Sequence, residues 1–218
     1  MYAAAVIWAP VRVLGRAAAD SNVLSGFIVT AVYAALGLAA AALSVFGGIT
    51  RAQFGAQPEL PPDMLGSIVR GTEVATLVLP VLAPFVLWIS VSLVMQLVTR
   101  FFGGQGPLSA TLAAVGVAGM PLALGALFQT VGTGLQAVLG VASTAGTVAG
   151  LVGGLVALAT LVWYVVLVVI GAAVARRIGY GESAGSCAVS CAGCLGLIIL
   201  VAVVLVGIGI LVGVTAPQ

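Results

Sequence analysis

The sequence predicts an all-α membrane protein: a polytopic transmembrane helical bundle of five spans, with a cytoplasmic N-terminus and short interfacial helices. Of its 218 residues, 62% are hydrophobic and only 6% are charged. A soluble globular domain has about 25% charged residues, so this chain could not cover its surface in water. The few charges lie in clusters between long apolar blocks, and the arginines favour one predicted side of the membrane.

The composition also excludes several classes of protein. The net charge is only +2, whereas a protein that binds nucleic acid needs a clustered basic face. The chain has no histidine, which removes the commonest general base and the commonest neutral metal ligand. The N-terminal segment has no basic stretch ahead of its apolar run, so it is not predicted to be a cleaved signal. We expect one multi-pass domain over residues 1–218 in the cell membrane, with the lipid bilayer as a partner and with no nucleic acid or cofactor.

The first element, residues 5–18, is predicted to be a helix at the membrane interface. Pro10 suits the first turn of a helix, and the apolar residues that follow lie near Arg12 and Arg16. The apolar residues of this segment include Ile7, Trp8, Val11 and Leu14.

The transmembrane spans are expected to lie between the charges. An arginine or aspartate at a helix centre costs about 2.5–3.5 kcal/mol, whereas a leucine returns only about 0.3–0.6 kcal/mol. A helix of about 20 residues crosses the hydrocarbon core. The predicted spans are residues 23–49, 74–99, 109–131, 151–174 and 191–214.

The longest charge-free block, residues 101–175, leaves two alternatives open. With two helices, residues 132–150 form a mostly exposed connection or a short interfacial helix; with three, they form a weak glycine-rich span. Five spans in total place five arginines inside and two outside, whereas six spans place three inside and four outside. Cytoplasmic segments carry the arginine excess in membrane proteins, which favours five spans.

Prolines mark two features of the second span. In residues 58–74, Pro61 and Pro62 precede Asp63, which favours a helix start on the outer surface before the span begins; an irregular loop fits equally well. Further along, Pro80 and Pro84 are expected to bend the span.

The stretch RFFGGQGPLS, residues 100–109, is predicted to form a tight cytoplasmic turn between the second and third spans. Its three glycines permit the positive φ values that a tight reversal needs. Pro107 then begins a helix that Ser109 or Thr111 can cap, and Pro121 breaks this helix midway.

This turn resembles the signature of the Yip family (Ypt/Rab-interacting proteins) as it occurs in prokaryotic members. In that signature an apolar segment ending in Arg is followed by Gly-Gly-x-Gly and a helix that carries Thr-Leu, Gly-x-Ala and Pro. The matching residues are Arg100, Gly103, Gly104, Gly106, Thr111, Leu112, Gly116, Ala118 and Pro121. The later run LVWYVVLVVIGAAVARRIGYGESAG is similar to the family's fourth span. The resemblance implies five spans and a non-enzymatic scaffold or adaptor in membrane organisation or trafficking-like processes.

Five arginines are candidates for contact with anionic lipid headgroups on the cytoplasmic side. Their alternative role is to set the topology alone. These residues are Arg12, Arg16, Arg100, Arg176 and Arg177.

Three cysteines are spaced C-x-x-x-C-x-x-C, at Cys187, Cys191 and Cys194. On a helix this spacing places them on one face, which suits a soft metal or a redox site. The alternative, which we favour, is that cysteine serves here as a small apolar residue in a packed helix. We therefore assign no metal site and no catalytic residue.

Gln96 and Gln129 are candidates for lining a path through the membrane. No ionisable residue falls at membrane depth, so a proton-coupled or ion-coupled carrier has no relay. The alternative functions are therefore a passive channel or transporter subunit for a small neutral solute, or an accessory subunit of a larger membrane complex with other membrane proteins as partners.

Overall fold

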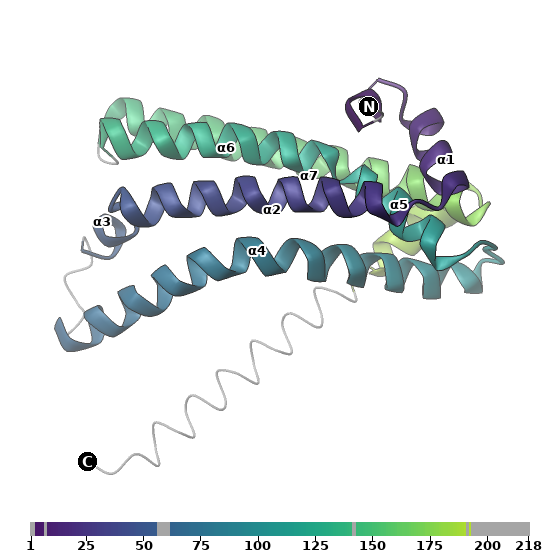
Figure 1. Cartoon of the computed structure of the whole chain (residues 1–218), viewed down its shortest axis with the longest axis horizontal. Helices are drawn as coiled ribbons and strands as arrows, with labels where there is room; N and C mark the ends of the chain where they lie inside the picture. Colours follow the sequence, from purple (N-terminus) through teal and green to yellow (C-terminus); the bar gives the residue numbers. More distant parts are fainter. Residues whose placement is uncertain (1–2, 7, 56–61, 141–142, 191, 193–218) are drawn as a thin grey trace, which may run out of the picture.

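The computed structural model describes residues 3–6, 8–55, 62–140, 143–190 and 192, and the regular elements among them are all helices (Figure 1). This confirms the all-α prediction. Four helical passages are long and apolar enough to cross a membrane: Val23–Phe46, Val69–Phe101, Leu108–Leu139 and Thr144–Arg176. The predicted fifth span, residues 191–214, lies outside the described residues apart from Ala192.

A short 3-10 helix, η1 (Ala3–Val6), and helix α1 (Pro10–Asp20) open the chain. As predicted, α1 begins at Pro10. It crosses the end of the bundle and packs on α5 and α7 (Figure 1). Leu14 is fully buried against the protein core, whereas Trp8 is 87% exposed. The apolar residues of this segment are thus divided between the protein core and the surface.

Helix α2 (Val23–Phe46) begins where the Asn22 side chain accepts a hydrogen bond from the Leu24 amide, at 3.1 Å. It ends three residues before the predicted boundary because the chain turns at Gly48, which has a φ of 71°. The short helix α3 (Ile49–Gly55) follows.

Helix α4 (Pro62–Phe101) is 40 residues long and begins at the predicted Pro-Pro-Asp sequence. From Pro62 onward the expected outer-surface segment is therefore neither a separate element nor an irregular loop, because the helix continues without interruption into the second span. Pro80 and Pro84 lie inside α4, and the helix bows along its length (Figure 1).

The third passage is broken in two, as Pro121 predicts. Helix α5 (Leu108–Ala118) ends at Gly119 and α6 (Met120–Leu139) begins with Pro121 in its first turn. The predicted cap is wrong: no side chain caps α5, because Thr111 is buried and donates instead to the Gln96 side chain, at 2.8 Å. Helix α5 lies at the centre of the bundle, and its buried residues are Ala110, Thr111, Ala113, Ala114, Val115, Gly116, Val117 and Ala118.

The small-residue stretch 132–150 is helical on both sides of a short turn. Helix α6 runs through to Leu139, Gly140 turns the chain with a φ of 86°, and α7 (Thr144–Arg176) begins one residue after the cap Ser143. Residues 101–175 thus hold two crossing passages, but the expected exposed connection is wrong. Within a membrane each backbone group needs an internal partner, which favours continuing both helices up to the turn.

The chain reverses after α7, and residues 180–190 are again helical. The main apolar core lies where this segment meets α1, α4, α5 and α7. The most apolar part of the α5–α6 passage is 61% buried, against 11% for α4, so α5 is the central element and α4 is peripheral.

Candidate functional site

The predicted turn forms a glycine loop, residues 103–106, between α4 and α5 at the end of the bundle crossed by α1. Helix α4 ends in a Schellman motif, with Gly103 at a φ of 74° and the Gly104 amide donating to the Thr99 carbonyl at 2.9 Å. Gly106 also has a positive φ, of 131°. Gly104 is required for a different reason, because a Cβ atom there would lie 2.7 Å from the Thr99 carbonyl oxygen.

Arg176, the last residue of α7, holds this loop in place. Its side chain is 1% exposed, and its Nε donates to the Thr99 hydroxyl at 2.9 Å. Its two terminal nitrogens donate to the carbonyl oxygens of Gly104, at 2.6 Å, and Gly106. In return, the Arg176 carbonyl accepts from the Gln105 amide at 2.9 Å. One arginine therefore binds both sides of the loop, and we name this arrangement the arginine clamp.

A glutamine supports the clamp from α4. The Gln96 amide nitrogen donates to the Gly106 carbonyl at 3.2 Å, and its oxygen accepts from the Thr111 hydroxyl at 2.8 Å. The Thr99 hydroxyl, which accepts from Arg176, donates to the Met95 carbonyl at 2.6 Å. The loop is thus fixed by side chains from α4, α5 and α7.

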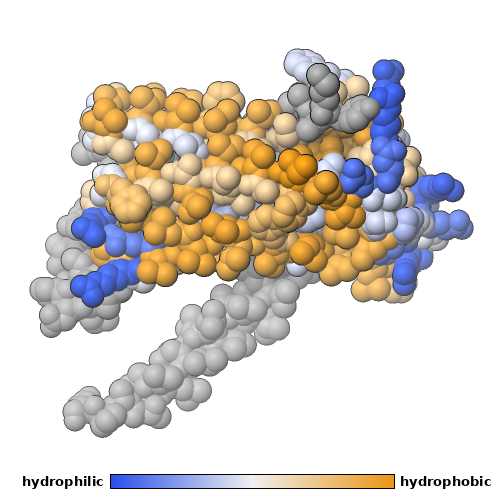
Figure 2. All heavy atoms as spheres, viewed as in Figure 1, coloured by the Kyte–Doolittle hydropathy of each residue, from blue (hydrophilic) through white to orange (hydrophobic). Residues whose placement is uncertain are grey.

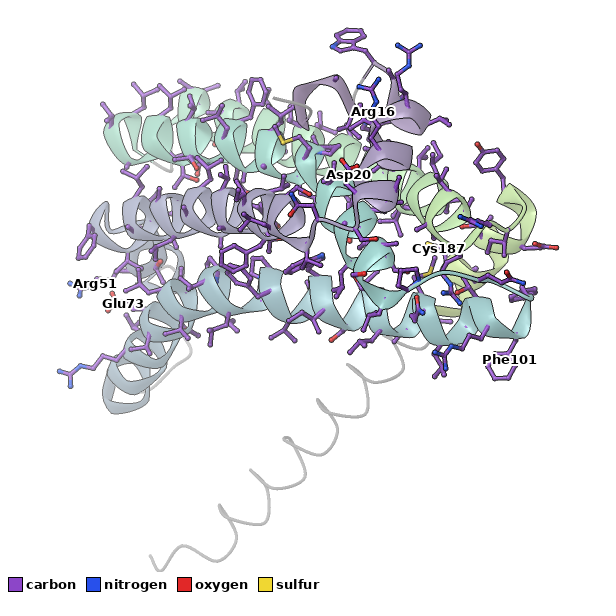
Figure 3. The ribbon with its side chains drawn as sticks, turned by 45° about the vertical axis from the view of Figure 1, so that its right-hand side comes forward. Arg16, Asp20, Arg51, Glu73, Phe101 and Cys187 are labelled. Atoms are coloured by element: carbon purple, nitrogen blue, oxygen red, sulfur yellow. The ribbon has the colours of Figure 1, made fainter. Side chains whose placement is uncertain are left out.

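The clamp holds a buried positive charge without a carboxylate. A salt bridge between Arg51 and Glu73 lies instead at the opposite end of the bundle, at 2.8 Å (Figure 3). Carbonyl oxygens replace the water around the guanidinium of Arg176, and hydrogen bonds from a charged donor are stronger than neutral ones. Removing Arg176 would take the donor from the half-buried Gly104 carbonyl and leave the Gly106 carbonyl with Gln96 alone, so the loop depends on Arg176.

The other signature residues form a helix crossing. A Cβ atom at Gly116 would lie 2.8 Å from Nε1 of Trp88 and would overlap the Cα of Gly26 on α2. The Trp88 indole donates to the Leu112 carbonyl at 2.9 Å. Gly116 therefore permits the contact of α5 with α2, and Ala118 beyond it is fully buried. Gly26 was not identified from the sequence, because nothing in the pattern pairs it with Gly116.

Four of the five candidate headgroup arginines are exposed at the end of the molecule that carries the glycine loop: Arg12, Arg16, Arg100 and Arg177. Arg176 differs from the expectation, because it is buried in the clamp and cannot reach a headgroup. Figure 2 shows hydrophilic residues gathered towards the two ends of the molecule with an apolar band between them. We call the end with the loop and these arginines the basic end.

Exposed aromatic side chains accompany these arginines. Phe101 is 84% exposed and Phe102 is 44% exposed, next to the loop, and Trp8 lies close to the start of α1. Aromatic residues are enriched at the level of lipid headgroups. The basic end therefore has the composition of a membrane–water interface.

The opposite end carries Arg51 on α3 and Glu73 near the start of α4 (Figure 3). The hydrogen bond to Glu73 raises the pKa of the Arg51 guanidinium. The charges therefore separate to the two ends of the long helices, as expected for a bundle that crosses a membrane.

The two glutamines predicted to line one path lie in different places. Gln96 belongs to the arginine clamp, whereas Gln129 lines a cavity of about 510 Å³ between α2, α4 and α6. The structure therefore does not join them into a single polar path.

Of the three cysteines, only Cys187 is described. It is 6% exposed and belongs to the main apolar core. The neighbouring serines on this helix bond to the protein: Ser183 donates to the Val169 carbonyl at 2.6 Å and Ser190 to the Met95 sulfur at 3.3 Å. Cys191 and Cys194 lie outside the described residues, so the predicted three-cysteine face stays a prediction.

Comparison with known proteins identifies the family to which the chain belongs. The model of the Yip1 domain matches residues 4–214, a range that contains the glycine loop, Arg176 and the four membrane-crossing passages. No curated protein and no solved structure matches the chain. The family match confirms the resemblance carried by the glycine loop and the helix after it. The chain is an integral membrane protein that belongs to the Yip1 domain family.

Proposed function

We propose that this protein is a non-enzymatic scaffold or adaptor of the cell membrane, a prokaryotic-type member of its family with five spans. Its basic end faces the cytoplasm, contacts anionic headgroups and binds other membrane proteins in membrane organisation or trafficking-like processes. The observation that carries the proposal is the arginine clamp, which gives an exposed loop one fixed shape.

The clamp supports a binding role because of where its polar groups point. Arg176, Gln96 and Thr111 are turned towards the loop and each other, so they stabilise a surface. The loop itself is exposed at Gly103, Gln105 and Gly106. A surface that is ordered before binding loses little conformational entropy when a partner docks.

The four exposed arginines support contact with anionic lipid. Each arginine close to an anionic membrane surface contributes about 1 kcal/mol. The described acidic residues near them are Asp20 and Glu182, and the amide of Gly179 already donates to the Glu182 carboxylate at 3.0 Å. The excess of arginine also supports a cytoplasmic location for this end.

Capture of partners tests the scaffold proposal. The tagged protein is cross-linked briefly in its native membranes, purified in mild detergent and compared by quantitative mass spectrometry with Gln105→Glu, a charge added at the exposed tip of the loop. We expect a stoichiometric protein partner whose recovery falls in this variant. The matched control is Ala52→Glu, which adds the same charge to an exposed position of α3, at the opposite end from the loop.

A preparation without a partner, or a partner retained equally by both variants, contradicts a binding role for the loop. An abundant partner that forms a stable complex would assign the accessory-subunit function. Steady flux of a small neutral solute into liposomes that contain only this protein would replace the scaffold with a passive channel.

Headgroup contact is measured separately, with spin-labelled anionic and zwitterionic lipids in reconstituted membranes. Changing the four exposed arginines to glutamine is expected to reduce the preference for anionic lipid. Arg51→Gln with Arg70→Gln, near the opposite end, is the control and is expected to retain the preference. An unchanged preference in the fourfold variant, with correct insertion, limits these arginines to setting topology.

A further inference from the structure

The cavity between α2, α4 and α6 has the size and lining of a ligand site. Its volume of about 510 Å³ falls within the range of roughly 300–1,000 Å³ that small-molecule sites occupy. Its lining carries six neutral polar side chains and no charged one. The polar residues are Tyr33, Ser44, Thr76, Gln129, Thr133 and Gln136.

Four of these polar groups have no hydrogen-bond partner in the described part of the chain. They are the hydroxyls of Tyr33, Thr76 and Thr133 and the side-chain amide of Gln129. Several hydroxyls elsewhere in the spans bond to helix carbonyls: Thr30 donates to Gly26 at 2.9 Å and Thr160 to Ala157 at 2.9 Å. In this cavity, by contrast, four unpaired polar groups lie around one space.

An unpaired polar group at membrane depth is costly because hydrocarbon offers it no hydrogen bond. The segment 191–214 cannot supply the missing bonds, since apart from two cysteine thiols its side chains are all apolar. The cavity therefore calls for an occupant that brings hydrogen-bonding groups of its own.

The chemistry of the lining narrows the class of occupant. A charged headgroup would have no counter-ion here, and a buried unpaired charge is strongly unfavourable. Leu79 and Leu87 line the cavity and are 59% and 51% exposed, so apolar surface leads from the cavity towards the lipid. An uncharged molecule with an acyl chain fits both features.

The bend in α4 makes room for the cavity. Pro80 lies close to α2, where a Cβ atom at Gly37 would be 3.2 Å from the Pro80 Cβ, and Pro80 and Pro84 both contribute to the lining. Figure 1 shows α4 curving away from α2 towards its Pro62 end.

We propose that this cavity binds an uncharged glycerolipid from the bilayer, of the mono- or diacylglycerol class. The Tyr33 hydroxyl and the Gln129 amide form hydrogen bonds with its hydroxyl and ester groups. Its acyl chain extends from the cavity into the bilayer between Leu79 and Leu87. This binding site is independent of the scaffold function, because it uses none of the clamp residues and lines a different part of α4 from the one that carries Gln96 and Thr99.

Photolabelling of the full chain tests the site. The protein is reconstituted in zwitterionic vesicles that contain a diacylglycerol with a diazirine on its acyl chain, and the labelled peptides are mapped by mass spectrometry. We expect labels on α2, α4 and α6, and competition by unlabelled diolein. Tyr33→Phe and Gln129→Leu should each weaken the competition about fivefold, the effect of losing one neutral hydrogen bond.

Tyr164→Phe is the matched control, since it removes a hydroxyl from a tyrosine in α7 that does not line this cavity. It should leave labelling unchanged, and equal helix content and monodispersity confirm that each variant folds. Labelling that is unaffected by both cavity substitutions overturns the proposal. Competition by glycerol in the aqueous phase, with none by diolein, also overturns it and assigns the cavity to a water-soluble polyol.

Discussion

The basic end and the cavity half of this bundle are built from helices of similar composition, yet they use their polar side chains in opposite ways. In the arginine clamp, Arg176, Gln96 and Thr99 bond to one another or to the loop backbone. In the cavity, Tyr33 and Gln129 face open space. A chain with few polar residues thus closes one end with a hydrogen-bonded network and leaves polar groups unpaired around a cavity in the other half.

The helices also pack more tightly at the basic end than around the cavity. At the basic end Gly116 meets Gly26 with no room for a side chain between α5 and α2. In the outer half, the bent helix α4 leaves a cavity against α2 and α6. Substitutions at the basic end should therefore cost stability, whereas substitutions that line the cavity should be tolerated.

Removing the clamp should have the largest effect. Arg176→Leu removes the donor to the Thr99 hydroxyl and to the Gly104 carbonyl and leaves the Gly106 carbonyl with Gln96 alone. We expect a loss of about 3–5 kcal/mol in the free energy of unfolding, from three charge-assisted hydrogen bonds that water replaces in part. Arg176→Lys should recover only part of it, because a single ammonium cannot reproduce the fork of the guanidinium. Denaturation in mixed micelles measures both.

The control for the clamp is the neighbouring arginine. Arg177→Leu removes the same charge from an exposed position and should change stability by no more than about 0.5 kcal/mol. Equal losses for the two arginines would mean that net charge, rather than the clamp, stabilises this end.

The helix crossing should give the next largest effect. Gly116→Ala places a methyl group where it would meet Gly26 and the Trp88 indole, and we expect a loss of about 1–3 kcal/mol. Gly154→Ala on α7 is the control, since no atom lies within 4 Å of its added Cβ and alanine favours the helix. Thermal unfolding in detergent distinguishes a contact at Gly116 from a general intolerance of larger residues.

The same threonine-to-valine substitution, made in each region, tests whether the hydroxyl matters more in the clamp than in the cavity. Thr99→Val removes the hydroxyl that accepts from Arg176 and donates to Met95, at an expected cost of about 1–3 kcal/mol. Thr133→Val, in the cavity lining, should change stability by no more than about 0.5 kcal/mol. If both variants unfold at the same denaturant concentration, the two regions do not differ as proposed.

The smallest effect is expected at the ion pair of the opposite end. Arg51 is 72% exposed and Glu73 is 15% exposed, so their bridge is accessible to salt. Arg51→Gln should lower the midpoint of thermal unfolding slightly at low ionic strength and not at all at about 1 M salt. A large shift that persists at high salt would show that this end is more tightly built than its contacts indicate.

Features that depend on composition and on backbone constraints could be predicted from the sequence. The shortage of charge specifies a membrane protein, and the prolines mark the starts of α1 and α4 and the break before α6. The turn at Gly103 and Gly106 follows from the positive φ that glycine permits. These signals depend only on a residue and its neighbours in the chain, so they can be predicted from the sequence.

Which polar residues bond to one another could not be predicted from the sequence and follows from the folded bundle. Arg176 and Arg177 are adjacent and chemically identical in sequence, yet one is buried and the other is exposed, because only the end of the last turn of α7 faces the loop. The same holds for Gln96 and Gln129, which resemble each other as isolated polar residues but serve the clamp and the cavity.

The physical reason is that a transmembrane helix is apolar on every side. Without an alternation of polar and apolar faces, the sequence does not say which side of a span meets protein and which meets lipid. The contact of Gly26 with Gly116 and the continuation of helices through residues 132–150 depend on close packing between helices, which only the folded bundle reveals.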